Sequence, residues 1–137
     1  MIDQSFGVIP ISFNENNPQV FLVQNKNGAF WGFPKGHAEE KETPKQAALR
    51  ELKEETALES IGDLFEQPLI EKYSFTHNGF SVKKTVTYFV LETTKESHLE
   101  EEEILDGGWF TLEQAKKKLT FPESISLLLK VEDILNN

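Results

Sequence analysis

The chain has 137 residues, of which 38% are hydrophobic, and it contains no cysteine. This length predicts one domain over residues 1–137, able to bury about two-thirds of the surface that the unfolded chain exposes. The absence of cysteine excludes disulfides and thiolate metal sites, and it fits a cytoplasmic protein. The 14 Lys and Arg against 23 Asp and Glu give a net charge of −9, which disfavours nucleic acid and anionic membranes as partners. No apolar run approaches the length of a membrane span.

Four segments predict the main strands in chain order: 6–13, 19–24, 68–76 and 81–92. Pro10 favours an edge or irregular position for the first. In the last, Val82, Val86, Tyr88 and Val90 alternate with Phe89 and Leu91, so we expect both faces of this strand to be partly covered. Residues 30–36 form a loop rich in aromatic residues and glycine, and residues 109–110 predict a short strand.

Three helices complete the expected elements. The first begins after Thr43, a good N-cap, with Pro44 at the first helical position and Gln46 placed for a capping box. The second covers 112–118 and the third 122–135, with an apolar stripe made of Ile125, Leu128, Leu129 and Ile134. The order β-β-α-β-β-β-α-α predicts an α+β fold in which helices cover both faces of a sheet, an α/β/α sandwich.

Three carboxylates, Glu51, Glu54 and Glu55, are spaced i, i+3 and i+4 in the first helix. Residues at these spacings share one helix face, and like charges placed so destabilise an isolated helix by a few tenths of a kcal/mol per pair. A divalent cation would relieve this repulsion. Mg²⁺ takes oxygen ligands and is commonly shared with substrate phosphates, so it is the expected cofactor, for which Mn²⁺ can substitute.

The spacing of Gly36, Glu42, Arg50 and the three helix glutamates resembles the Nudix box, Gly-x5-Glu-x7-Arg-Glu-U-x-Glu-Glu-x-Gly-U, where U is a bulky aliphatic residue. The resemblance implies the Nudix fold, in which a mixed sheet lies between helices. One position departs, because Ala57 stands where the family has glycine. Glycine there suits a left-handed helix end, so we expect this helix to end differently.

The same resemblance implies roles for the residues of the box. The metal ligands are expected to be Gly36, Glu51, Glu54, Glu55 and Glu103, and the catalytic groups Glu54, Glu55 and Glu103. Relatives carry a glutamate six residues before a tryptophan, as Glu103 precedes Trp109, although four adjacent glutamates leave Glu102 as an alternative. Arg50 and Glu42 are expected to pair and to brace the loop against the helix. The chemistry implied is metal-dependent hydrolysis of a phosphoanhydride by an activated water.

The segment 30–37 resembles the corresponding part of asymmetric diadenosine tetraphosphate hydrolases (bis(5′-nucleosyl)-tetraphosphatases), which yield ATP and AMP. This resemblance implies that Lys84 binds phosphate and that Phe121 stacks on adenine. A second stacking aromatic falls near Phe75 or His77. Lys35 and His37 are expected to grip the rest of the phosphate chain. The expected partner is therefore a small-molecule nucleotide.

Other functions remain open from the sequence alone. A Nudix nucleoside triphosphate pyrophosphohydrolase has the same box. An RNA 5′-pyrophosphohydrolase would need a basic surface for the RNA body, against which the net charge argues. A non-catalytic nucleotide-sensing module is the third reading, and the full set of box glutamates argues against it.

Overall fold

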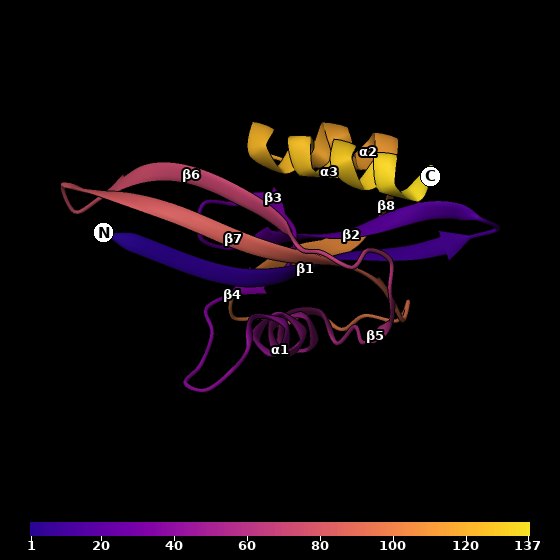
Figure 1. Ribbon diagram of the computed structural model, residues 1–137, viewed down its shortest axis with the longest axis horizontal. Coiled ribbons are helices and arrows are strands. Elements are labelled where there is room, and N and C mark those ends of the chain that lie inside the picture. The colour runs from indigo at the N-terminus through magenta and orange to yellow at the C-terminus, as the bar shows by residue number, and fades with distance from the viewer.

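A mixed sheet of eight strands forms the middle layer of the computed structural model, which describes residues 1–137 (Figure 1). Five strands follow the order β3-β2-β1-β7-β5, while β4 pairs with β1, β6 with β7 and β8 with β2. The strands are β1 (Ile2–Asn14), β2 (Asn17–Asn25), β3 (Trp31–Gly32), β4 (Lys35–Gly36), β5 (Ser60–Asp63), β6 (Leu69–His77), β7 (Phe80–Thr93) and β8 (Ile104–Thr111).

The long strands β1 and β7 run parallel through the centre of the sheet, in register from Ile2 opposite Lys83 to Ile11 opposite Glu92. The expectation of an edge position for β1 is therefore wrong. On its other side, β1 pairs antiparallel with β4 at Phe6 and Gly7. From Ile11 onward it pairs antiparallel with β2 instead. Pro10 lies between these two pairings, so the sheet accommodates it at a break in the ladder.

Helices cover both faces of the sheet, as the sequence predicts. The helix α1 (Pro44–Thr56) lies on one face, and α2 (Leu112–Lys118) and α3 (Pro122–Leu135) lie together on the other (Figure 1). Val86, Tyr88 and Val90 belong to the core under α2 and α3, whereas Leu91 belongs to the core under α1. The α+β sandwich is thus confirmed, and β7 contributes to both cores.

Some elements differ from the expectations. The strand β5 was not predicted, because all four of its residues are exposed and show no alternation. The two-residue strands β3 and β4 lie in the segment expected to be a loop. In α3 the buried residues include Leu127 and Val131, whereas Leu129 is 49% exposed, so the expected stripe was rotated by part of a turn.

Both ends of α1 can be traced to single residues. The Thr43 side chain accepts a hydrogen bond from the Gln46 N–H, and the Gln46 side chain accepts one from the Thr43 N–H, which confirms the capping box. At the other end Ala57 adopts φ 64° and ψ 5°. The helix therefore ends in the left-handed turn usual for glycine, and the expectation of a different end was wrong.

Candidate active site

The glutamates of α1 differ in burial because the helix packs on the sheet along one face. Glu55 shares that face with Ala48 and Leu52, and it is only 6% exposed. Glu51 is half-buried and Glu54 is exposed. The exposure of the three carboxylates thus increases from Glu55, against the sheet, to Glu54, in the solvent. The start of their helix is fixed by its capping box.

Arg50 lies at the centre of the box and donates hydrogen bonds to four of its residues. Its Nε donates to Oε2 of Glu42 at 2.7 Å and its Nη2 donates to Oε1 at 3.0 Å, a two-pronged ion pair. Nη1 donates to Glu51 at 3.0 Å and to Glu54 at 3.1 Å, and Nη2 also donates to the carbonyl of His37 at 2.9 Å. The hydrogen bonds from Arg50 lower the pKa of Glu42, and the bond to Glu42 is the main reason that the pKa of Arg50 is raised. Loop 37–42 is therefore tied to the helix.

Gly36 approaches the helix so closely that no side chain fits there. A Cβ placed on it would lie 2.1 Å from the Cδ of Glu51 and 2.4 Å from each carboxylate oxygen. The strand β4 holds Gly36 opposite Phe6 of β1, so the backbone cannot withdraw without loss of this pairing. The backbone of Gly36 and the carboxylate of Glu51 consequently face one another directly.

The pKa shifts of Glu51 and Glu55 reflect burial and the negative charges close to them. Burial, together with the charges of Glu51 and Glu103, raises the pKa of Glu55 to about 8. Burial also raises the pKa of Glu51, against the hydrogen bond from Arg50. Glu51 and Glu55 are thus costly to ionise beside the neighbouring carboxylates, although Arg50 and Lys35 supply positive charge nearby.

These donors fit a hard divalent cation. They are all oxygens, they come from carboxylates that repel one another, and the Gly36 backbone lies against one of them. No three His, Asp or Glu side chains of the chain converge into a metal site as they stand. Arg50 holds Glu51 and Glu54 instead, so both carboxylates would have to turn from the guanidinium to bind an ion.

The acidic segment 100–103 approaches the carboxylates through Glu103. Among its four glutamates, Glu103 is the one whose charge raises the pKa of both Glu51 and Glu55. The carboxylate of Glu100 accepts hydrogen bonds from the backbone N–H groups of Glu102 and Glu103, and it is thereby used within its own turn. The structure brings Glu103 near the helix, in agreement with its predicted position.

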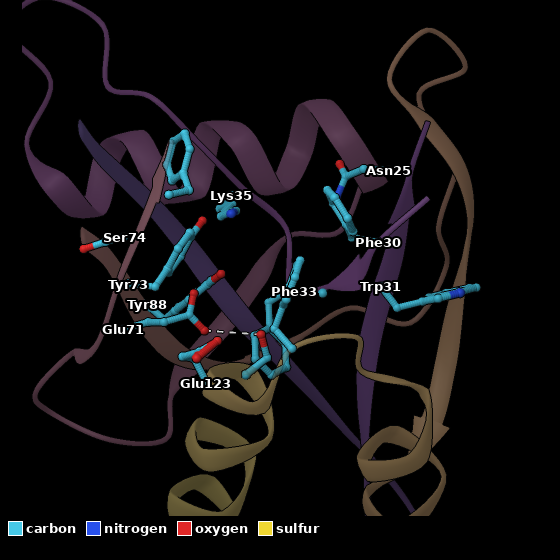
Figure 2. A pocket seen from close by; sticks show the side chains of 14 residues that line it. Asn25, Phe30, Trp31, Phe33, Lys35, Glu71, Tyr73, Ser74, Tyr88 and Glu123 are labelled. Atoms are coloured by element: carbon cyan, nitrogen blue, oxygen red, sulfur yellow. Dashed lines mark hydrogen bonds between the residues drawn. The ribbon is translucent and has the colours of Figure 1, made fainter. Parts of the chain in front are cut away.

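A cavity of about 560 Å³ opens between β6, the segment 30–35 and the start of α3 (Figure 2). It brings together three of the predicted substrate residues: Lys35, Phe75 and Phe121. The rings of Phe121 and Phe30 are 4.9 Å apart, and those of Phe75 and Tyr73 are 6.1 Å apart. Burial is the main cause that lowers the pKa of Lys35. The charges of Glu71, in the cavity, and of Glu55, on α1, also act on it, so Lys35 lies between the cavity and α1.

Three other predicted residues are not in this cavity. His37 pairs with Asp3 at 2.8 Å, and the Lys84 ammonium contacts the other oxygen of Asp3 and the Ser5 hydroxyl, each at 2.6 Å. Lys84 lines a smaller neighbouring pocket of about 330 Å³. His77 lies near the tip of the β6–β7 hairpin, where its ring contacts Asn78.

Sequence reasoning missed several residues that line the cavity, among them Phe30, Glu71 and Tyr73. Glu71 and Tyr73 share a strand with Phe75 at alternating positions, and this spacing was available as a signal once Phe75 had been chosen. Trp31 is half-buried and contributes both to the core and to the cavity.

The geometry of the box can now be compared with known proteins. The sequence model of the NUDIX domain family matches residues 1–130, and the chain belongs to this family. A crystal structure of a C. elegans Ap4A hydrolase binary complex superimposes with a TM-score of 0.75 over 98% of both chains, at 25% identity. The NUDIX domain of Shewanella oneidensis NrtR, complexed with ADP ribose, has a TM-score of 0.70 over 98% of this chain and 89% of that one, at 18% identity.

Two curated relatives are longer than this chain. The putative mutator protein MutT4 of Mycobacterium tuberculosis is 25% identical over 115 residues, which are 83% of this chain and 46% of the relative. Nudix hydrolase 6 of Arabidopsis thaliana is 30% identical over 118 residues, 79% of this chain and 39% of the relative. The chain therefore spans less than half the length of these two proteins. None of its own helices is both long and apolar enough to cross a membrane.

Proposed function

We propose that this Nudix domain hydrolyses a phosphoanhydride bond of a dinucleoside polyphosphate, and that it splits diadenosine tetraphosphate into ATP and AMP. One observation carries the proposal. The carboxylates of α1 and an aromatic-walled cavity lie on either side of Lys35, whose charge acts on both Glu55 and Glu71. The cavity could therefore hold the base of a nucleotide while its scissile phosphate lies at the neighbouring α1 carboxylates.

The residues of the box divide the chemistry among themselves. Glu51, Glu54, Glu55, Glu103 and the Gly36 carbonyl would hold Mg²⁺ or Mn²⁺, which when bound neutralises phosphate charge and makes a bound water more acidic. Water oxygen then bonds to phosphorus as the P–O bond of the leaving phosphate breaks.

The proton of that water passes to one of the carboxylates Glu54, Glu55 or Glu103. Arg50 takes no part in this transfer. It fixes Glu42 and the loop from His37, and so holds the backbone at Gly36 in place.

The cavity supports a nucleotide substrate on physical grounds. A base stacked on aromatic side chains gains about 1–3 kcal/mol, and Phe75 and Phe121 both line the cavity. Lys35 supplies positive charge at the end nearest the carboxylates. His37 and Lys84 are held by Asp3, so they meet a phosphate only if it competes with that carboxylate. The Ap4A hydrolase of C. elegans supplies the precedent for the substrate.

A nucleoside triphosphate pyrophosphohydrolase is the second candidate. The 8-oxo-dGTP diphosphatase of Proteus vulgaris is 43% identical over 49 residues, which are 33% of this chain. An RNA pyrophosphohydrolase of Hydrogenovibrio crunogenus matches a similar share, but the net charge of −9 opposes binding of an RNA body. A sensing module without catalysis would not need the complete carboxylate set.

A product assay separates these candidates. The protein is incubated with Mg²⁺ and with a panel of dinucleoside polyphosphates and nucleoside triphosphates, and the products are resolved by chromatography. ATP and AMP in equal amounts from diadenosine tetraphosphate support the proposal. Two ADP, or faster cleavage of a triphosphate, reject the substrate, and full turnover in excess chelator rejects the metal requirement.

Glu55→Gln tests where the chemistry occurs. The variant keeps the size of the side chain and removes its charge, so we expect kcat to fall by at least about 100-fold. Glu66→Gln, at an exposed glutamate outside both pockets, is the matched control and should retain the wild-type rate. A Glu55→Gln variant that is folded and fully active would place the reaction elsewhere.

A further inference from the structure

The aromatic cavity contains a carboxylate that the hydrolysis does not use. Glu71 is 6% exposed and lies on β6, where it lines the cavity beside Tyr73 (Figure 2). Ser124 Oγ donates to its Oε2 at 3.2 Å, and its Oε1 has no hydrogen-bond partner. No fully buried side-chain polar atom in the protein lacks a partner, so this oxygen keeps some accessible surface, and Glu71 lines the cavity.

The surroundings of Glu71 act on its charge in opposite directions. Ser124 lies in the first turn of α3, whose N-cap, Phe121, provides no side-chain hydrogen bond. Burial raises the pKa of Glu71, while the positive charge of Lys35 and the Ser124 hydroxyl oppose that rise. The cavity thus contains the Glu71 carboxylate, a hydrogen-bond acceptor, among its aromatic lining residues.

We propose that Glu71 recognises the Watson–Crick edge of a guanine stacked in this cavity. A carboxylate only accepts hydrogen bonds. Guanine presents two adjacent donors, N1–H and the 2-amino group, whereas adenine presents one donor beside the lone pair of its N1. A carboxylate therefore matches guanine with two bonds and opposes the N1 of adenine. Buried polar groups discriminate strongly when one analogue leaves them unpaired.

This inference rests on the proposed function to the extent that a nucleoside end occupies the cavity. Bond cleavage itself depends on the phosphate chain and not on the base, so diadenosine tetraphosphate is still split. A substrate with guanine at one end binds better, because Glu71 gains partners that adenine cannot supply. The specificity therefore lies in a residue of β6, apart from the α1 carboxylates.

Equilibrium binding of GMP and AMP tests the inference without any turnover. For the wild type we expect GMP to bind at least about tenfold more tightly than AMP in calorimetric titration, within the 5–150-fold range of a good paired contact. Glu71→Gln keeps an acceptor for Ser124 and adds an N–H donor for adenine N1, so the preference should move to AMP. Equal affinities in the wild type, preference for AMP, or no binding of either nucleotide overturns the inference.

Two further variants separate base recognition from a structural role. Glu123→Gln removes the other carboxylate that lines the cavity, and GMP should remain preferred. If Glu123→Gln shifts the preference and Glu71→Gln does not, the assignment to Glu71 is wrong. Should Glu71→Gln fail to fold, Glu71→Asp is the alternative variant, because it keeps the carboxylate but places it further from the cavity. Glu71→Asp should weaken GMP binding at least fivefold and leave AMP binding unchanged. An unchanged GMP affinity in Glu71→Asp contradicts the proposal.

The same titrations distinguish this inference from the proposed function. A preference that switches in Glu71→Gln while no dinucleotide is cleaved would reject the hydrolysis and retain the base recognition. Cleavage of diadenosine and diguanosine tetraphosphate at equal kcat/KM, with no change of the ratio in Glu71→Gln, would retain the hydrolysis and reject the base recognition.

Discussion

Ala57→Gly should stabilise the protein, although it removes a methyl group. Ala57 has φ 64°, in the left-handed region, and its side chain is exposed, so little contact is lost when it is removed. A non-glycine residue pays about 1–2 kcal/mol for this conformation. Glycine makes the unfolded chain more flexible, which costs about 0.4–1 kcal/mol. The net gain is about 0.8 kcal/mol, or about 3 °C in Tm for a chain of this length.

The assay is urea unfolding with thermal unfolding as a second measurement. Ala38→Gly is the matched control, because Ala38 is also exposed and has no positive φ. That variant carries only the unfolded-state cost, so we expect it to lose about 0.4–1 kcal/mol. The reasoning is refuted if Ala57→Gly is no more stable than the wild type, or if both variants change stability by the same amount.

Three other outcomes follow from single contacts. Thr43→Ala breaks the capping box of α1 and should lower the free energy of unfolding by about 1 kcal/mol in urea titration, while a Thr43→Ser variant should stay within half of that loss. Arg50→Lys cannot form the two-pronged pair with Glu42, so kcat should drop at least about tenfold in the product assay with little change in Tm; an unchanged kcat would show that the brace is dispensable. Burial raises the pKa of Glu71, so its neutral form stabilises the fold below the ordinary value of 4.5 and this contribution is lost as pH rises through the higher folded pKa. Wild type should therefore lose stability relative to Glu71→Gln from pH 4.5 upward, and a constant difference in urea unfolding between pH 4.5 and 8 would contradict this.

Local signals in the sequence predicted local structure well. The start of α1 depends on Thr43, Pro44 and Gln46, which interact within one turn, and the structure has the cap as expected. The pairing of Arg50 with Glu42 was also predicted, because both residues belong to one recognisable motif. In each case the chemistry of a few neighbouring residues suffices to specify the geometry.

Contacts between distant segments explain what the sequence did not reveal. The cavity is assembled from β6, the segment before α1 and the start of α3, and no periodicity links these three. His37 and Lys84 were expected to be free for phosphate, but the register of β1 against β7 places Asp3 opposite Lys84. Leu129 and Leu127 differ by two positions in an apolar run, and only the docking of α3 on the sheet decides which of them is buried.

The position of Glu103 among four adjacent glutamates depends on tertiary contacts. The end of α1 leaves carbonyls without helical partners, and residues 98 and 100 provide donors for two of them. The His98 N–H donates to the Thr56 carbonyl at 2.9 Å, and the Glu100 N–H donates to the Glu55 carbonyl at 3.0 Å. These bonds fix the segment at the helix end where the left-handed turn at residue 57 redirects the chain.

Two further contacts then select one glutamate. The Glu100 carboxylate is engaged by backbone N–H groups within its own turn, and Ile104, which follows, is buried in the core beneath α1. Glu103 precedes this anchor, and its charge reaches both Glu51 and Glu55. A deletion of one residue among positions 100–102 would therefore shift the glutamate that reaches the helix while leaving the composition of the segment almost unchanged. We expect such a deletion to reduce kcat far more than substitution of Glu101 by Gln, because position relative to the α1 carbonyls, and not the number of charges, decides which carboxylate enters the site.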